Sequence, residues 1–253
     1  MYLSVVVPVN NQEDRVIRGL EKIDDYLSKQ HYSSEIIVVD DGSTDNTLDI
    51  IARFSENYPR IRILKNNINQ GKGAAIRKGI LNSDGEYVLF TDIELETPIE
   101  DVERLFYWFY QGYDIVIGSR HTFDPSVKVE NQIERKVLSN IFNGIIKTIA
   151  LHGFNDTQCN FKAFKKEAAK TLFSHQKLDS MSFDIEILYL AVRFGFLCKE
   201  VAVNWKHTPK NKSGLIEDSM KMFKDIIHIK ELHKFTFITK ENVKIEEDLV
   251  CKT

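Results

Sequence analysis

The chain has 253 residues, of which 43% are hydrophobic, so it is long enough for one large domain with a sizeable core. Its 34 Lys and Arg residues against 37 Asp and Glu residues give a formal net charge of −3, which excludes a general electrostatic attraction to nucleic acid or to an anionic membrane. Three separated cysteines fit neither a disulfide framework nor a metal-binding spacing. Together with the lack of a signal-like leader or a membrane-length apolar run, they predict a cytoplasmic protein.

Short β-branched segments alternate with helical periods through the first half of the chain. The segments predict strands at 3–9, 35–41, 61–66 and 86–92, and helices at 13–30, 44–57 and 72–83. In the first helix, apolar residues form one stripe, namely Val16, Leu20, Ile23 and Leu27. Alternation of this kind is typical of βαβ units, so we expect an α/β fold with a mostly parallel mixed sheet flanked by helices.

The second half begins with a clear helix signal. Thr97 can cap a helix, Pro98 suits its first position, and Glu100 completes a Thr-x-x-Glu capping box. Downstream we expect a strand at 114–120, a loop at 121–132 and a helix at 133–151. These are followed by a strand and a helix at 161–173, a helix at 184–195 packed on the sheet edge, a strand at 197–207 and a helix at about 216–235. Residues 1–235 then form a single domain, with halves at 1–120 and 121–235, and 236–253 form a charged tail.

Acidic residues end two of the predicted strands. Asp40 and Asp41 end the second strand and precede a Gly-Ser-Thr-Asp turn, where a carboxylate could bind a nucleobase or a ribose. Turn and helix-cap chemistry is the alternative, and it accounts for residues 42–45 without a ligand. In an open parallel sheet, ligands bind beyond the carboxyl ends of the strands, which is where these acids are predicted.

Two glycines flank Lys72 at the predicted start of the third helix. Backbone N–H groups, the helix dipole and a cation therefore meet at Gly71, Lys72 and Gly73, which favours an anion. The spacing matches neither a P-loop nor a dinucleotide fingerprint, so a tight strand-to-helix turn is the alternative.

Three acids follow the apolar strand 86–92 at alternating positions. If the chain stays extended, the side chains of Asp92, Glu94 and Glu96 converge. Carboxylates so close repel one another unless a cation lies between them, and their oxygens suit Mg²⁺ or Mn²⁺ carrying a diphosphate. The alternative is that they line the solvated start of the next helix, where negative charge is favourable.

The motifs together resemble family 2 glycosyltransferases with the GT-A fold over residues 1 to about 235. The resemblance rests on these segments in this order: SVVVPVNNQED, EIIVVDDGSTDNT, NQGKGAAIRKGI, YVLFTDIELETP, IVIGSR, DTQCNFKAF and FDIEIL. Within the family, the chain is similar to the polyprenyl (dolichyl) phosphate sugar synthases. DTQCNFKAF and the Thr-Pro after the acids favour the dolichyl-phosphate β-glucosyltransferase branch over dolichyl-phosphate mannose synthase. The resemblance implies an inverting enzyme that moves glucose from UDP-glucose to a polyprenyl phosphate, with a GDP-mannose enzyme as the alternative.

The acidic motif departs from the family pattern. Relatives usually carry Asp-x-Asp, whereas this chain has Asp92-Ile93-Glu94, which is one methylene longer at the second acid. A glutamate can still coordinate a divalent ion. The departure leaves open reduced activity, an altered metal preference or a non-catalytic nucleotide-sugar-binding protein.

The resemblance implies roles for particular residues. The nucleotide sugar would be bound by Pro8, Asn11, Glu13, Asp40, Asp41, Lys72, Arg77 and Asp92. The metal, Mg²⁺ or Mn²⁺, would be held by Asp92, Glu94 and Glu96, and the acceptor phosphate by Arg120, Arg135 and Ser139. Ordinary surface charge is the alternative for Arg135.

The candidate catalytic residues are Asp92, Glu94, Arg120 and Asp184. The role of Asp184 depends on the acceptor. For a hydroxyl acceptor it would be a general base. A phosphate acceptor needs none, because its second pKa is about 6 and an ionised oxygen is available at neutral pH. Asp184 would then orient the sugar or the acceptor loop.

The last predicted helix carries an apolar stripe beside lysines. The stripe includes Met220, Phe223, Ile226, Ile227 and Ile229. It suits peripheral contact with the cytoplasmic face of a membrane. Packing on the chain's own domain and formation of a homodimer are the alternatives.

Overall fold

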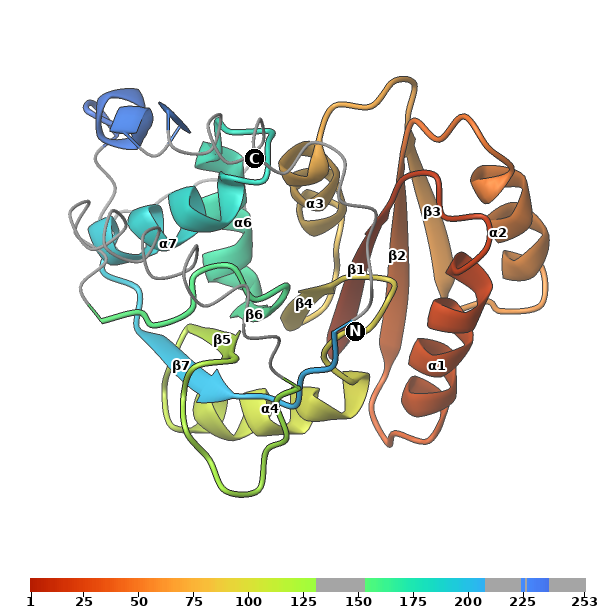
Figure 1. Cartoon of the computed structure of the whole chain (residues 1–253), viewed down its shortest axis with the longest axis horizontal. Helices are drawn as coiled ribbons and strands as arrows, with labels where there is room; N and C mark the ends of the chain where they lie inside the picture. Colours follow the sequence, from red (N-terminus) through yellow and green to blue (C-terminus); the bar gives the residue numbers. More distant parts are fainter. Residues whose placement is uncertain (131–152, 208–223, 226, 237–253) are drawn as a thin grey trace, which may run out of the picture.

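The computed structural model describes residues 1–130, 153–207, 224–225 and 227–236 (Figure 1). Seven strands form one sheet in the order β3-β2-β1-β4-β6-β5-β7. The strands are β1 (Leu3–Val9), β2 (Ser34–Asp41), β3 (Ile61–Asn66), β4 (Tyr87–Thr91), β5 (Ile115–Ser119), β6 (Phe161–Lys165) and β7 (Cys198–Ala202). The helices are α1 (Val16–Ser28), α2 (Thr47–Ser55), α3 (Lys72–Leu81), the 3-10 helix η1 (Ile99–Asp101), α4 (Val102–Tyr110), α6 (Lys166–His175) and α7 (Phe183–Arg193).

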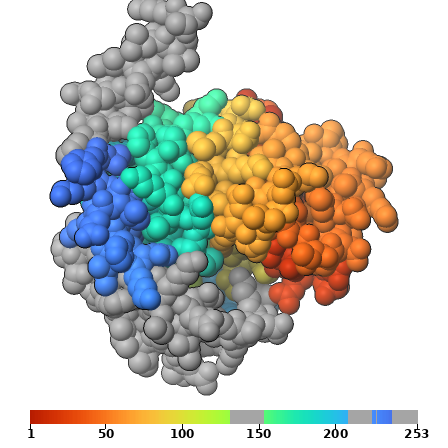
Figure 2. All heavy atoms as spheres, turned by 90° about the horizontal axis from the view of Figure 1, so that it is seen from above, coloured from red at the N-terminus to blue at the C-terminus, as the bar shows by residue number. Residues whose placement is uncertain are grey.

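Helices cover both faces of the sheet, as the alternating pattern predicts (Figure 1). One core lies under α1, α2 and α4, and the predicted stripe of α1 is fully part of it, from Val16 to Leu27. The other core lies under α3, α6 and α7, and Figure 2 shows the residues of α3 packed directly against those of α6. Each strand of the centre is therefore buried on both faces, which explains its near-continuous Val, Ile and Leu composition.

The sheet is mixed and mostly parallel, as predicted. The parallel pairs are β1 with β2, β1 with β4, β2 with β3, and β5 with β7. β6 runs antiparallel between β4 and β5, a position that its local pattern does not encode. The prediction that the helix at 184–195 packs on the sheet edge is wrong, because α7 covers one face and contributes Phe183 and Ile185 to the core there.

The predicted capping box at Thr97 is wrong. The helical region starts with η1, whose N-cap is Pro98 and has no side-chain cap. Thr97 is buried, and its hydroxyl interacts with the Cys159 thiol instead. The carboxylate of Asp101 binds Asn204, 2.9 Å from Oδ1 to Nδ2, so tertiary contacts take the polar groups that could have capped this helix.

The end of the chain packs on its own domain where the structure describes it. Residues 224–225 and 227–232 are helical, with Ile229 and His233 fully buried and Ile227 and Phe235 exposed. Among the described residues, no helix is both long and apolar enough to cross a bilayer. The predicted helix at 133–151, the apolar residues Met220, Phe223 and Ile226, and the tail at 237–253 lie outside the described residues.

Candidate active site

The strand order reverses at β1. The chain goes from β1 to β2 and β3 on one side and then crosses to β4 on the other. β1 pairs with β2 through Val9, whereas its pairing with β4 ends at Val6 opposite Phe90. Half-buried Pro8 lies beyond that point, opposite Val39. A crevice outside the carboxyl ends of the strands at such a switch point is where open α/β sheets bind ligands.

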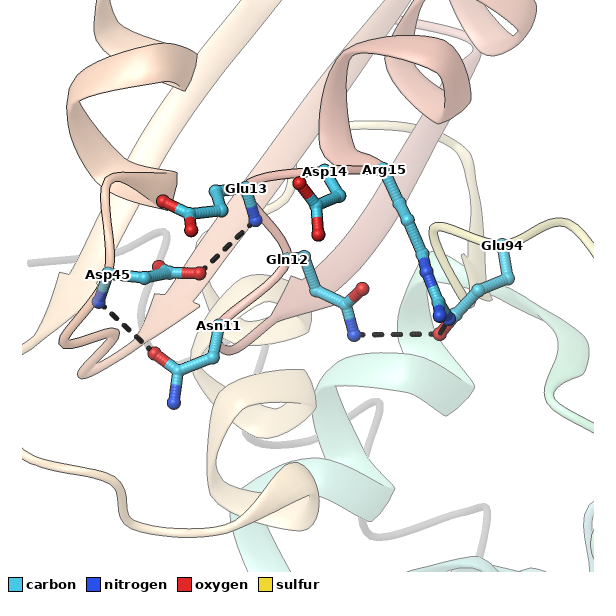
Figure 3. Close-up of a pocket in the computed structure, with 7 residues that line it drawn as sticks. All are labelled: Asn11, Gln12, Glu13, Asp14, Arg15, Asp45 and Glu94. Atoms are coloured by element: carbon cyan, nitrogen blue, oxygen red, sulfur yellow. Dashed lines mark hydrogen bonds and ion pairs between the residues drawn. The ribbon is translucent and has the colours of Figure 1, made fainter. Parts of the chain in front are cut away.

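A pocket of about 460 Å³ opens at this switch point (Figure 3). Its lining comes from the loops after β1, β2 and β4, and consists of Asn11, Gln12, Glu13, Asp14, Arg15, Asp45 and Glu94. The Glu94 carboxylate points toward Arg15 and Gln12, with Oε1 at 4.0 Å from Arg15 Nη1 and 3.5 Å from Gln12 Nε2. The pocket has the size of a small-molecule site, and polar groups dominate its wall.

Asn11 and Glu13 join two of the loops that line the pocket. Asn11 has a positive φ of 51°, and its Oδ1 accepts a hydrogen bond from the Thr44 N–H at 2.8 Å. Glu13 Oε2 accepts one from the Asn46 N–H at 3.0 Å. Both side chains therefore satisfy N–H groups at the start of α2, and the nucleotide role predicted for them remains a prediction.

Asp40 and Asp41 hold the backbone beside the pocket. Asp40 accepts hydrogen bonds from the backbone N–H and the hydroxyl of Ser43, which is the turn chemistry given above as the alternative. Asp41 reaches further, since its Oδ1 accepts from the Gln70 N–H at 3.0 Å and its Oδ2 from the Gly71 N–H at 2.8 Å. The second acid of the pair thus ties the end of β2 to the start of α3.

The start of α3 is occupied by the chain itself. The carbonyl of Asp179 accepts hydrogen bonds from the N–H groups of Gly73 and Ala74, at 2.8 and 3.3 Å. Arg77 Nη1 lies 2.7 Å from Asp179 Oδ1 and so binds the segment 176–179. In this conformation these N–H groups serve a tight turn, and the cation of the motif, Lys72, points at Asp92 with Nζ 2.5 Å from Oδ1.

The three acids after β4 do not converge. The Leu95 N–H donates to the Asp92 carbonyl at 3.1 Å and Leu95 has a φ of 49°, so the chain turns instead of staying extended. Asp92 contacts Lys72, Glu94 faces Arg15, and Glu96 lies 3.7 Å from His207 Nδ1.

Within the part of the chain that the structure describes, no three His, Cys, Asp or Glu side chains are placed to hold a metal. The donor set is nevertheless all carboxylate, which suits Mg²⁺ or Mn²⁺. The residues fit such an ion in chemistry and would need a side-chain rearrangement to fit it in geometry.

Arg120 and Asp92 line a narrow crevice together. Its Nε and Nη2 donate to Asp156 at 2.7 Å each, and its guanidinium stacks over Trp205 at 5.6 Å. Burial raises the pKa of Asp156, but the hydrogen bonds and charge of Arg120 outweigh it and hold that pKa below its usual value. The crevice is lined by Thr91, Asp92, Glu96, Thr97, Arg120, Cys159, Asn160 and Trp205. Arg135 and Ser139 lie outside the described residues, so their acceptor role remains a prediction.

Asp184 is buried at the start of α7, beneath the edge of the sheet. Its Oδ1 accepts a hydrogen bond from Lys162 Nζ at 2.6 Å. Burial raises the pKa of Asp184 in spite of the lowering effect of Lys162. Sequence reasoning missed Lys162, although a lysine between Phe161 and Ala163 in an apolar strand was a signal. It also missed Asp156 and Arg15.

Comparison with known proteins places the chain in a family. A family model described as glycosyl transferase family 2 matches residues 4–173. The dolichyl-phosphate beta-glucosyltransferase of Dictyostelium discoideum is 35% identical over 242 residues, covering 91% of this chain and 74% of that protein. The Homo sapiens dolichyl-phosphate beta-glucosyltransferase is 34% identical over 245 residues, with 90% and 74% covered.

A solved structure shares the architecture. Glucosyl-3-phosphoglycerate synthase from Mycobacterium tuberculosis, crystallised with UDP, matches with a TM-score of 0.65 and 18% identity over 92% of this chain and 79% of that one. The likeness shows that the fold is GT-A.

Proposed function

Since the chain belongs to glycosyltransferase family 2, we propose that this glycosyltransferase moves glucose from UDP-glucose to a polyprenyl phosphate of the dolichyl type, with inversion to a β-linked product. The observation that carries the proposal is the similarity to proteins named dolichyl-phosphate beta-glucosyltransferase, which extends over nine tenths of the chain at about one third identity. The pocket at the switch point, with acids on three loops, supports a polar donor there.

The donor would lie across the carboxyl ends of β1 and β4. The nucleoside would occupy the pocket between the loops at 10–15 and 43–45, and the diphosphate would reach toward Lys72 and Asp92. Lys72 would then exchange its contact with Asp92 for the diphosphate. Asp92, Glu94 and Glu96 would hold Mg²⁺ or Mn²⁺, which would stabilise the negative charge that develops on the departing UDP.

The acceptor phosphate would supply its own nucleophile. An ionised phosphate oxygen attacks the anomeric carbon, the bond from that carbon to the diphosphate oxygen breaks, and UDP leaves with the electron pair. A general base is unnecessary, because the second pKa of a phosphate is about 6. Asp184 is suited to positioning, since it is buried and bound to Lys162. Arg120, Arg135 and Ser139 would orient the phosphate, with Arg120 itself held by Asp156.

A lipid acceptor requires the protein to meet a membrane surface. In the described residues at the end of the chain, Ile229 on the helix faces the core, whereas Ile227 on the helix and Phe235 in the turn after it are exposed, near Lys230 and Lys234. We propose this exposed face for peripheral membrane contact.

Transfer of labelled glucose to a short polyprenyl phosphate tests the proposal. Purified protein with UDP-glucose and Mn²⁺ or Mg²⁺ is expected to form a lipid-phosphate glucose, and parallel GDP-mannose reactions are expected to give little product. Preferential use of GDP-mannose would contradict the donor. Donor binding with no transfer to any polyprenyl phosphate would instead identify a binding protein, the reading that the Asp-Ile-Glu motif left open.

A further inference from the structure

Lys162 is a fully buried lysine beneath the active-site edge of the sheet. It lies on β6 opposite Phe90, two residues before Asp92 on the neighbouring strand, and its side chain is 1% exposed. Its Nζ donates at 2.6 Å both to Asp184 Oδ1 and to the carbonyl of Cys159, and lies 5.3 Å from the centre of the Phe90 ring. One ammonium group thus connects β6, the start of α7 and the loop that enters the crevice beside Asp92.

A buried ion pair contributes little to stability for its own sake. The desolvation of both charges offsets most of their attraction, and well-packed apolar side chains of similar volume are often as stable. Cys159, whose carbonyl binds Lys162, and its neighbour Asn160 line the crevice beside Asp92. Because the pair contributes little to stability and lies next to the crevice, we expect it to have a role in the site.

A second ion pair lies within electrostatic range of the first. The start of α3, which carries Lys72, packs on the start of α7, which carries Asp184, since a Cβ built on Gly73 would lie 2.8 Å from the Cβ of Phe183. In keeping with this proximity, the charge of Lys72 lowers the pKa of Asp184, as that of Lys162 does, although burial raises it. The Lys72 ammonium is 2.5 Å from Asp92. Two ion pairs, Lys162 with Asp184 and Lys72 with Asp92, are therefore neighbours at the start of α3, where the proposed function places the donor's diphosphate.

We propose that Lys162 is a positioning residue of the donor site, an inference that rests on the proposed function. Its ammonium group orients Asp184, and the charge of Asp184 keeps Lys72 at the sheet edge beside Asp92, ready for the diphosphate. Lys162 does not touch the donor; it acts through Asp184 and Lys72.

Three variants separate positioning from stability. Lys162→Met leaves a buried carboxylate unpaired, Lys162→Met with Asp184→Asn removes both charges, and Lys165→Met is the matched control. Lys165 lies on the same strand, where it pairs with Asp114 at 3.6 Å and is partly exposed. For each, we would measure the Tm, the Kd for UDP-glucose with Mn²⁺ by calorimetry, and the rate at which an amine reagent labels Lys72 in the donor-free protein, read by mass spectrometry.

Lys162→Met is expected to lower the Tm, and the double variant to recover most of it because no unpaired charge stays buried. In the double variant the Kd should nevertheless remain about tenfold weaker, which corresponds to about 1.4 kcal/mol, and Lys72 should be labelled severalfold faster than in the wild type. Lys165→Met should change neither the Kd for UDP-glucose nor the labelling rate of Lys72.

A double variant with wild-type Kd and wild-type labelling of Lys72 would overturn the inference, because the pair would then be structural. Labelling needs no donor, so it decides the role of Lys162 by itself. Failure of the wild-type protein to bind UDP-glucose would overturn the proposed function instead.

Discussion

Replacement of Asp156 by asparagine tests how much of the fold depends on the anchoring of Arg120. Asp156 is 2% exposed and accepts three hydrogen bonds from Arg120, from the backbone N–H at 2.9 Å and from Nε and Nη2 at 2.7 Å. In Asp156→Asn the neutral amide no longer balances the guanidinium, and one end of the amide presents N–H groups to other N–H donors. Removing one partner of a buried pair costs roughly 3–5 kcal/mol.

We expect the lower end of that range, about 3 kcal/mol, because a quarter of the Arg120 side chain is exposed and can be rehydrated. For a chain of this size, roughly 2–4 °C per kcal/mol gives a fall in Tm of about 6–12 °C. Calorimetry at neutral pH measures this directly. Asp114→Asn, which alters another buried acid, directly before β5, is a control for the general cost of such a change.

The pH dependence gives a second check on the same variant. Arg120 holds the pKa of Asp156 below its usual value, so the stabilisation is complete above the unfolded pKa of about 3.9 and is lost as the pH falls through the folded pKa. The gap in Tm between wild type and Asp156→Asn should therefore shrink in acid. A fall of less than about 2 °C at neutral pH, or a gap that widens in acid, would refute the reasoning.

Three further predictions concern the site. Glu94→Ala should abolish the Mn²⁺-dependent part of UDP-glucose binding measured by calorimetry, and unchanged affinity with Mn²⁺ would remove Glu94 from the metal ligands. Gly71→Ala should lower the free energy of unfolding by at least about 1 kcal/mol more than Gly112→Ala. Both glycines have a positive φ, 104° at Gly71 and 93° at Gly112, so the backbone strain is similar. A Cβ on Gly71 would lie 2.4 Å from the Asp179 carbonyl oxygen, whereas a Cβ on Gly112 would have no described atom within 4 Å. Equal losses in urea titrations would show that this contact can relax. Arg135→Ala should raise the acceptor KM more than the donor KM in steady-state kinetics, and the opposite order would argue against an acceptor role.

Much of the architecture is encoded locally, and the sequence was sufficient for it. Strand and helix periods predicted five of the seven strands, β1 to β5, to within one residue of their observed bounds. They also predicted β6 at the start of the segment 161–173, and β7 with an end five residues too late. Parallel strands joined by helices place their carboxyl ends on one edge, so the acids at the end of β2 and those after β4 lie on the same edge of the sheet. The order of the motifs was enough to identify the family.

The partners of the acidic side chains were decided by the tertiary structure alone. Asp41 binds Gly71, Asp92 binds Lys72, and Lys162 reaches Asp184, each across at least 20 residues of sequence. Local spacing suggested that Asp92 and Glu94 converge, but a turn closed at Leu95 sends them to different partners. Periodicity follows from backbone geometry within a segment, so it can be recognised in the sequence. The hydrogen-bond partner of a buried side chain depends on which distant groups the packed core brings within about 3 Å of it and shields from water, so it is decided by the tertiary structure.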